Sequence, residues 1–371
     1  MKDVILINYT GRKGGGALDA YEISKAVINE GLPVVAVLSD QIENLRMWEK
    51  LKLEKLVTIP TYHNVLDAAV ETVLFSFKQK SLILNELENY KVRYIFCPMG
   101  ALWSHKINAL FPEAIKGIVI HDPKPHSGDE WKSKINLSGY DEYDHLFVHS
   151  KTFIDFVREK YKKPTSFMLL GTHETYKNCE NKTSIVKYDS KKINFMFFGR
   201  IEKYKGLDVL GTAYEKVYNQ IGNKTTLTII GSGDFSPYKA QYDNLKNVKV
   251  INRWIKDEEV ESIFTGENII CICPYTNATQ SGVVLIAMDY KVPLIATTTG
   301  GMTEQIENGV TGILVPPSDS KALTEAMIQL AENKEDRKKM KEEQEKHMLT
   351  MGWNVSARQL IEAMDIKLNK C

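Results

Sequence analysis

Two cationic side chains follow a short apolar run in the second half of the sequence. Arg200 and Lys205 stand five positions apart in GRIEKYKG, directly after the predicted strand Ile193–Phe198. Ligands bind at the carboxyl ends of the strands in open α/β sheets. Two cations there would suit an anion, because a hydrogen bond to a charged group contributes about 1.5–3 kcal/mol. The alternative interpretation is a pair of solvated loop residues.

A second candidate anion site lies in the segment PYTNATQSGVV. The apolar strand Ile269–Cys273 opens there into a polar loop and then an apolar helix, which would start at Ser281, Gly282 and Val283. Free amides and the positive end of the helix dipole make such a start a phosphate site. Ordinary capping by Ser281 or Thr279 accounts for the same residues equally well.

Two further strand ends carry residues that could contact a ligand. Gly231 and Gly233 form a G-x-G after one strand, although Ser236 stands where the third glycine of the dinucleotide fingerprint would be. A plain tight turn is the alternative there. Glu304 follows another strand and would open a helix, where a carboxylate either contacts a ligand or stabilises the helix start.

The first half of the chain offers one histidine of interest. His121 and Asp122 follow a predicted strand, and a hydrogen-bonded turn is the alternative to a ligand contact. We interpret the nearby HSGDE segment, with Asp129 and Glu130, as an acceptor-side loop together with Asp122. The histidines of the chain show no metal-ligand spacing, so no metal site is predicted.

Apolar runs separated by helical segments must position these residues. The pattern occurs twice and predicts two Rossmann-like domains with parallel, doubly wound sheets. The strands expected in the first half are Val4–Asn8, Leu32–Leu38, Arg93–Cys97, Gly117–Ile120 and Leu146–His149. Those expected in the second half are Ile193–Phe198, Leu227–Ile230, Val248–Ile251, Ile269–Cys273, Leu294–Ala296 and Ile313–Val315.

Three other segments complete the organisation. The polar stretch Gly171–Lys192 is interpreted as an interdomain linker. The Lys- and Glu-rich Ala331–His347 is expected to form one solvated helix. Asn354–Lys370 reads as a final amphipathic helix.

Composition restricts the class of protein. The 371 residues carry 48 Lys+Arg and 47 Asp+Glu, a formal charge of +1, so composition gives no drive toward nucleic acid. The five cysteines form no C-x-x-C pair, which favours reduced thiols in the cytoplasm. No apolar run approaches the 18 or so residues that span a bilayer.

Taken together and in this order, the motifs resemble glycosyltransferase family 4 of the GT-B fold. The similarity is dense from about Ile193 to Ser318 and looser before it, where GRKGGG and IHDP still fit. The resemblance implies two Rossmann-like domains facing a cleft. It places residues 1–170 and about 352–371 in an acceptor-side domain, 171–192 in a linker, and 193–351 in a domain that binds a nucleotide-diphosphate sugar.

The resemblance also implies roles for residues. By that match, Arg200 and Lys205 neutralise the leaving diphosphate, and the helix start at 281–283 faces the phosphates and the sugar. Gly15 and Gly16 match a loop that closes on the same phosphates, and His121 matches a contact to the donor sugar. The implied reaction retains anomeric configuration and needs no cofactor; with no D-x-D in the sequence, no metal is expected either.

One departure from the family concerns two glutamates, which would fall on Ala278 and Ile286. The candidates to replace them are Asn277, Thr279, Gln280 and Glu304. The alternative to an enzyme of bacterial surface-polysaccharide synthesis is therefore a weak or inactive partner subunit that binds a nucleotide sugar. A nucleotide-sugar epimerase is a third, less favoured hypothesis.

The expected substrates are a UDP- or GDP-sugar and a glycan or lipid-linked acceptor. The basic, aromatic stretch Phe153–Phe167 fits such an acceptor if it lies against anionic lipid at the inner face of the plasma membrane. A plain amphipathic helix end is the alternative.

Overall fold

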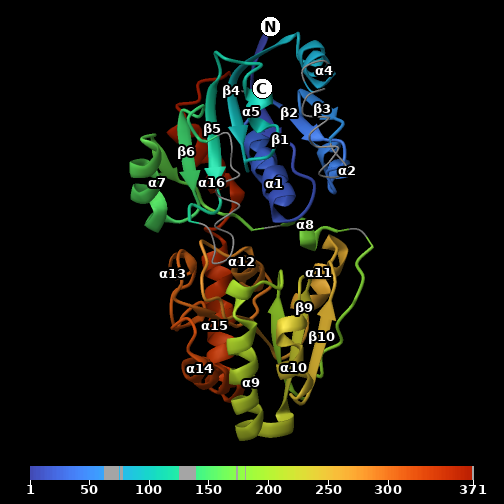
Figure 1. Cartoon of the computed structure of the whole chain (residues 1–371), viewed down its shortest axis with the longest axis vertical. Helices are drawn as coiled ribbons and strands as arrows, with labels where there is room; N and C mark the ends of the chain where they lie inside the picture. Colours follow the sequence, from blue (N-terminus) through green and yellow to red (C-terminus); the bar gives the residue numbers. More distant parts are fainter. Residues whose placement is uncertain (62–74, 76–77, 125–138, 173, 180, 370–371) are drawn as a thin grey trace. The chain divides into compact units, whose positions relative to one another are not determined.

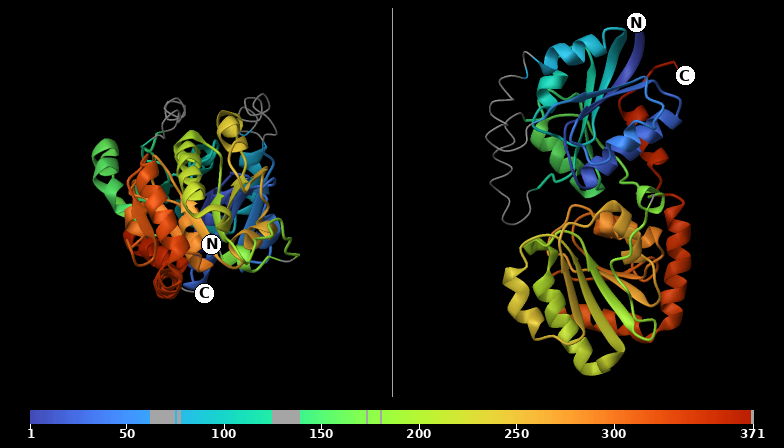
Figure 2. Two further views of the ribbon diagram at one scale, coloured as in Figure 1. Left: turned by 90° about the horizontal axis from the view of Figure 1, so that it is seen from below. Right: turned by 90° about the vertical axis from the view of Figure 1, so that its right-hand side faces the viewer.

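The computed structural model describes residues 1–61, 75, 78–124, 139–172, 174–179 and 181–369 (Figure 1). The chain forms two compact units. The first unit contains residues 1–123, the segment 132–171 and the C-terminal residues 352–371, and the second is built on residues 172–351. In each unit helices cover both sides of a sheet (Figure 2).

The first unit holds a seven-stranded sheet in the order β3-β2-β1-β4-β5-β6-β7, with every neighbouring pair parallel. Its strands are β1 (Lys2–Tyr9), β2 (Val34–Ser39), β3 (Lys55–Ile59), β4 (Tyr90–Cys97), β5 (Ile115–Ile120), β6 (His145–Val148) and β7 (Thr165–Phe167). The main helices are α1 (Gly15–Asn29), α2 (Leu45–Trp48), α4 (Gln79–Glu86), α5 (Ser104–Asn108), α7 (Ile154–Tyr161) and α16 (Trp353–Ala363).

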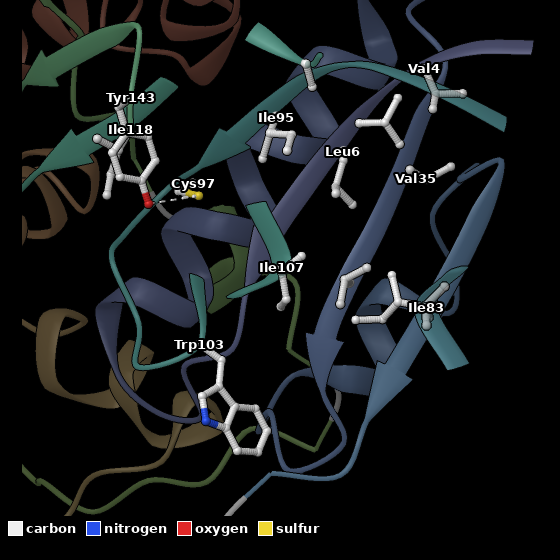
Figure 3. Packing of buried hydrophobic residues seen from close by; sticks show 14 of the residues in the cluster. Val4, Leu6, Val35, Ile83, Ile95, Cys97, Trp103, Ile107, Ile118 and Tyr143 are labelled. Carbon is white, nitrogen blue, oxygen red and sulfur yellow. Dashed lines mark hydrogen bonds between the residues drawn. The ribbon is translucent and has the colours of Figure 1, made fainter. Parts of the chain in front are cut away.

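Continuous apolar strands are stable in this sheet because both of its faces are covered. All six residues of β2 are buried, as are the last six of β1. Figure 3 shows one side of this core, where Trp103 and Ile107 pack with strand residues such as Leu6 and Ile95.

The C-terminal helix α16 belongs to the first unit and packs beside α1. Gln359 accepts a hydrogen bond from the Leu169 amide at 2.8 Å, and the Ser356 hydroxyl donates to the Leu169 carbonyl at 2.7 Å. The first unit is therefore assembled from both ends of the chain.

The second unit holds a six-stranded parallel sheet in the order β10-β9-β8-β11-β12-β13. Its strands are β8 (Ile193–Phe198), β9 (Thr225–Gly231), β10 (Val248–Asn252), β11 (Ile269–Cys273), β12 (Leu294–Thr297) and β13 (Ile313–Val315). The helices are α8 (Glu174–Lys177), α9 (Leu207–Ile221), α10 (Ser236–Asp243), α11 (Asp257–Phe264), α12 (Gly282–Asp289), α13 (Met302–Gln305), α14 (Ser320–Glu332) and α15 (Lys334–Met348).

Strand order reverses between β8 and β11, which defines the topological switch point of the second sheet. Helices α9 and α10 lie on one side of this sheet and α15 on the other (Figure 2). The doubly wound architecture predicted from the sequence is confirmed in both units.

Three details of the expected elements were wrong or missed. Strands β3 and β7 were not predicted. The expected helix over 331–347 is broken at Asn333, whose side chain caps α15 by accepting from the Asp336 amide. This helix is also not wholly solvated, because Arg337 and Gln344 are buried and donate to main-chain carbonyls of neighbouring segments.

The final helix ends at Ala363, seven residues before the predicted end. Among the described residues, no helix combines the length and the apolar character needed to cross a membrane.

Glycine permits a close approach of two backbones at the end of β9. Gly231 has φ +149°, and a Cβ there would lie 1.7 Å from the Gly199 carbonyl oxygen. The Gly199 and Ile201 amides donate to the Ile230 and Ser232 carbonyls at 3.0 and 2.8 Å, so pairing continues past both strands. Packing alone therefore accounts for this glycine.

We expect Gly231→Ala to destabilise the second unit by about 3 kcal/mol or more, because a backbone atom must move to admit the methyl group. Gly222→Ala is the matched control: φ there is +64°, but no atom lies within 4 Å of the added Cβ. The control should cost less, because its positive φ is the only penalty there. Urea unfolding measures both, and equal losses would contradict the steric explanation.

Candidate functional site

The loops that follow β8, β11 and β12 pack together at the switch point of the second sheet. A Cβ on Gly206 would lie 2.0 Å from the Pro274 carbonyl oxygen, and one on Gly300 would lie 1.8 Å from that of Ala278. The Thr276 amide donates to the Tyr204 carbonyl at 2.8 Å. The carboxyl edge of the sheet is thus a single packed surface rather than three independent loops.

Lys205 lies within this packed surface against two aromatic rings. Its Nζ atom is 3.7 Å from the ring centroid of Tyr275 and 4.8 Å from that of Tyr204. An ammonium group over aromatic faces gains about 0.5–2 kcal/mol, depending on its desolvation. Burial raises the pKa of the Tyr275 hydroxyl well above its usual range, so the phenol stays neutral. The Tyr275 phenol is consequently not a counterion of the ammonium group.

Arg200 occupies the same loop with a different environment. Its side chain is 61% exposed, and one guanidinium nitrogen lies 3.0 Å from a carboxylate oxygen of Glu202. An exposed ion pair of this kind is worth little. The guanidinium can therefore exchange this carboxylate for another anion at small cost.

Helix α12 starts at the same edge. The Ser281 hydroxyl caps it by accepting from the Val284 amide, and the Ser281 main chain is held by Gln305, which accepts from its amide at 2.9 Å and donates to its carbonyl at 3.2 Å. These hydrogen bonds use the Ser281 and Val284 amides but not the amides of Gly282 and Val283.

The surroundings of Gly282 are open. A Cβ there would meet no atom within 4 Å, while one on Gly199 would lie 3.7 Å from a Val283 methyl group. The end of β8 and the start of α12 are thus neighbours. Free amides at a helix start, with the dipole behind them, form an anion site.

The other predicted residues of the second unit have varied settings. Asn277 and Glu304 are exposed, and Thr279 is buried with its carbonyl accepting from the Gly301 amide. Gln280 holds a buried side-chain oxygen that has no hydrogen-bond partner in the described part of the chain. Gly233 has φ +151° and packs against the Ile201 carbonyl, so its conformation, like that of Gly231, has a structural explanation.

Apolar residues occupy both positions at which the family would carry glutamates. Ala278 and Ile286 are buried. No carboxylate reaches the site from either position.

In the first unit, the glycine-rich loop leads into α1. Gly14 precedes the helix, and its amide donates to Glu43 at 2.6 Å. A Cβ on Gly16 would meet Met99 and the Tyr9 hydroxyl, whereas one on Gly15 would meet nothing within 4 Å. Gly16 is thus required by packing, and Gly15 is the position with open space beside it.

His121 is held by its main-chain surroundings. Its Nε2 lies 2.9 Å from the Pro98 carbonyl and must donate to it, and its ring meets the His149 ring edge-on at 4.9 Å. His149 is buried and its Nδ1 donates to the Met168 carbonyl at 2.8 Å; burial, aided by His121, lowers its pKa to about 4. Asp122 follows at an exposed position. Asp129 and Glu130 lie outside the described residues.

Sequence reasoning missed two residues that support the candidate anion site. The Tyr275 ring packs against the Lys205 ammonium, and Gln305 holds the main chain of Ser281 at the start of α12. The tyrosine two positions after β11 was a signal available in the sequence, whereas the role of Gln305 depends on how two loops pack.

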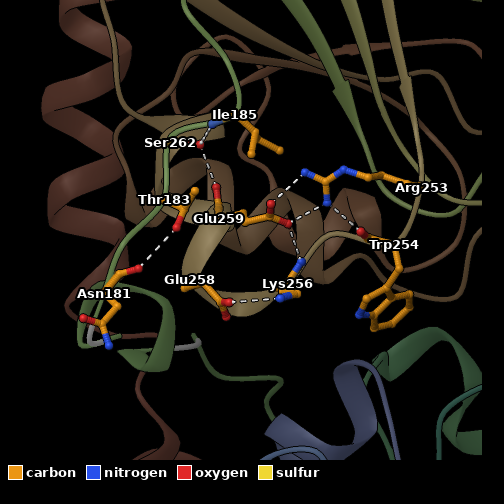
Figure 4. Close-up of polar contacts among 9 residues, drawn as sticks. All are labelled: Asn181, Thr183, Ile185, Arg253, Trp254, Lys256, Glu258, Glu259 and Ser262. Carbon is orange, nitrogen blue, oxygen red and sulfur yellow. Dashed lines mark hydrogen bonds and ion pairs between the residues drawn. The ribbon is translucent and has the colours of Figure 1, made fainter.

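A further loop at the same edge, after β10, was also missed (Figure 4). Arg253 pairs with Glu259 through two hydrogen bonds of 2.7 Å, and Glu259 also accepts from the Lys256 amide at 2.9 Å. This bidentate pair lowers the pKa of Glu259. The pair joins the two ends of the loop between them. Trp254, which lies in this loop, is 47% exposed.

No group of three or more His, Cys, Asp and Glu side chains able to hold a metal ion occurs in the described ranges. The expectation of a metal-independent reaction stays a prediction.

Solved structures with the same architecture identify the class of fold. The Anabaena protein HepE, described in complex with UDP and glucose, matches with a TM-score of 0.70 and 14% identity over 98% of this chain and 99% of that one. The fold is therefore that of GT-B glycosyltransferases.

Comparison with protein families gives a match that lies within the second unit. Residues 178–347 match the family described as "Glycosyl transferases group 1", so the chain contains a domain of this kind. An "Uncharacterized 41.2 kDa protein in cps region" of Klebsiella pneumoniae is 32% identical over 155 residues, 42% of this chain and 40% of that protein. The "O-antigen chain mannosyltransferase C" of Escherichia coli is 27% identical over 190 residues, 45% and 49%. The matched part spans less than half the length of each relative.

The histidine pair gives a pH prediction for the first unit. The unfolded chain protonates His149 near pH 6.5 but the folded unit only near pH 4, so the free energy of unfolding should fall as pH decreases between these values. His149→Asn keeps a donor near the Nδ1 position and removes this titration. We expect a shallower decline for the variant in urea unfolding across this range. Identical slopes would contradict a neutral, buried His149.

Proposed function

We propose that the protein is a retaining glycosyltransferase that moves a sugar from a nucleoside-diphosphate sugar to a glycan or lipid-linked acceptor. The observation that carries the proposal is the half-buried Lys205 ammonium, on Tyr275, in the same packed loop surface as the open start of α12. This arrangement lies within a glycosyl transferases group 1 domain. It suits a diphosphate, which binds to fixed donors and point charges.

The chemistry follows from the leaving group. As the bond between the anomeric carbon and the phosphate oxygen breaks, negative charge grows on the diphosphate, and preorganised cations and amides stabilise it. Lys205, Arg200 and the Gly282 and Val283 amides supply these groups. The acceptor oxygen attacks the same face of the sugar, and its proton passes to the departing phosphate oxygen. No carboxylate nucleophile is required in this scheme.

The remaining roles belong to the same proposal. Gly15 and its loop close on the phosphates, and His121 contacts the donor sugar with the Nδ1 acceptor that its bond to Pro98 leaves. Asn277, Thr279, Gln280 and Glu304 are the candidates for sugar and ribose hydroxyls. The unpartnered Gln280 oxygen is the strongest of them, because a buried acceptor gains most from a hydroxyl donor.

The biological setting is proposed from the relatives. One is described as a protein of a cps region and another as an O-antigen chain mannosyltransferase, which supports synthesis of a bacterial surface polysaccharide. HepE is described with UDP and glucose, which supports a UDP- or GDP-sugar as donor. We place the protein in the cytoplasm, where helix α7 provides a membrane-facing surface: Lys160 lies over the rings of Phe156 and Tyr161 at 5.5 and 5.0 Å.

Two substitutions test the proposed cations. Lys205→Met keeps an apolar stem on the aromatic rings and removes the charge, and Arg200→Ala removes the guanidinium. Each should reduce kcat about 100-fold or more, since single electrostatic contacts to developing charge are worth that much. Lys239→Ala, an exposed lysine of α10, is the control and should retain full turnover. The assay is release of nucleoside diphosphate with a lipid-linked acceptor; unchanged turnover in both variants would overturn the assignment.

The buried, apolar Ala278 and Ile286 favour a second candidate, a partner subunit that binds a nucleotide sugar and turns it over weakly or not at all. A thermal-shift panel of nucleoside diphosphates and their sugars addresses binding. A ligand at 100 times its Kd adds about 2.7 kcal/mol of stability to the folded state. Stabilisation without turnover for any donor, together with a transferase that copurifies in stoichiometric amount, would favour the second candidate over the first.

A further inference from the structure

A cavity of about 550 Å³ opens between α9, α10 and the loop after β8, and we name it the α9–α10 pocket. Its volume is in the range of small-molecule sites. Among the residues that line it are Ile201, Glu202, Lys203, Asp208, Asp234 and Tyr238. None of the roles proposed above uses this pocket, although Glu202 shares a loop with Arg200 and Lys205.

The walls of the α9–α10 pocket are fixed. The Gln241 side chain of α10 donates to the Asp208 carbonyl at 3.0 Å and to the Thr212 hydroxyl at 3.1 Å. The Tyr242 hydroxyl donates to the Leu207 carbonyl at 2.7 Å. Gly211 allows this close packing, since a Cβ there would lie 2.6 Å from Gln241. A preformed pocket binds a ligand without the cost of ordering its walls.

Tyr238 contributes a polar group that no protein group satisfies. The residue is 8% exposed, yet its hydroxyl makes no hydrogen bond within the described part of the chain. Burial and then the charges of Asp208 and Asp234 raise the pKa of this hydroxyl, and both aspartates line the same pocket. This hydroxyl is open to the pocket and not a buried unpartnered atom, so it can exchange a water molecule for a hydroxyl group of a ligand.

The two carboxylates also have free acceptor capacity. Both hydrogen bonds from Ser236 go to the same oxygen of Asp234, Oδ1, at 2.9 and 2.6 Å. The other oxygen of Asp234 and both oxygens of Asp208 accept no hydrogen bond among the described residues. The pocket therefore presents several acceptors and one hydroxyl, beside apolar surface from the exposed Pro237.

Charge narrows the class of ligand. The carboxylates of Asp208 and Asp234 repel phosphates and other anions, while Lys203 at the wall and Arg200 paired with Glu202 offset much of their charge. No metal-holding group occurs among the described residues. A neutral molecule with many hydroxyl donors and an apolar face satisfies these acceptors best, and a sugar ring has both properties.

We propose that the α9–α10 pocket binds a neutral sugar residue of a glycan. Its hydroxyl groups donate to Asp208 and Asp234, the Tyr238 hydroxyl forms a hydrogen bond with the sugar, and the C–H face of the ring packs on Pro237. The inference goes beyond the proposed transfer reaction, because this binding requires neither a nucleotide nor turnover.

The test measures binding of methyl α-glycosides of glucose, mannose and galactose to the full chain by saturation-transfer NMR. We expect at least one to bind in the millimolar range, and the anionic glucuronate to bind more weakly. Tyr238→Phe and Asp208→Asn should each raise its Kd about fivefold to tenfold, the effect of losing one hydrogen bond of about 1 kcal/mol. Tyr218→Phe and Glu215→Gln, at partly exposed and exposed positions of α9, are the matched controls and should leave the Kd unchanged.

The melting temperature of each variant shows whether it folds. If Asp208→Asn does not fold, the Kd of Tyr238→Phe tests the proposal, because that variant keeps the aromatic ring. Failure of all three neutral glycosides to bind at tens of millimolar would overturn the proposal. So would binding that neither variant weakens, or tighter binding of the anionic glucuronate. Stabilisation by nucleoside diphosphates is measured in parallel on every variant. That readout tests the proposed glycosyltransferase site, whereas glycoside binding tests the α9–α10 pocket, so failure of one proposal is distinguished from failure of the other.

Discussion

The second unit depends on main chain meeting main chain where a side chain would not fit. At Gly206, Gly231 and Gly300, neighbouring loops at the carboxyl edge of the sheet approach so closely that a Cβ would lie within 2.0 Å of a carbonyl oxygen. These contacts join the loops after β8, β9, β11 and β12 into one surface. A site built on that surface is preorganised, because its loops cannot move independently.

The chemistry of the candidate site follows from that rigidity. Lys205 is held over Tyr275, whose carbonyl accepts from the Thr297 hydroxyl at 2.6 Å, and the α12 start is held by Gln305. Charge and amides are thus fixed by residues that would not themselves touch a ligand. Arg200 differs, since its exposed pairing with Glu202 leaves it the adaptable member of the set.

The sequence predicted the architecture well because buried parallel strands are continuous apolar runs. β8, β11 and β13 were predicted to the residue, and the residues at their ends followed from topology. β3 and β7 were missed because each is short and contains polar or half-buried positions. The break at Asn333 and the burial of Arg337 were not predicted, because the many charged residues of this segment are typical of a solvated helix. Arg337 is buried because it donates to carbonyl groups of α14. Tyr238 and Gln305 acquire their significance only from loops and helices that come together in space.

The return of α16 to the first unit has a consequence for biosynthesis. Trp353 packs against Gly171, where a Cβ would lie 2.6 Å from the indole, and Met364 packs similarly against Gly117. These partners leave the ribosome only after the whole second unit has been made. The first unit therefore remains incomplete while the second unit is being translated, because the apolar face beside α1 is covered only once α16 has been made. A stop codon before Gly352 would leave that face exposed to solvent rather than merely shorten a tail.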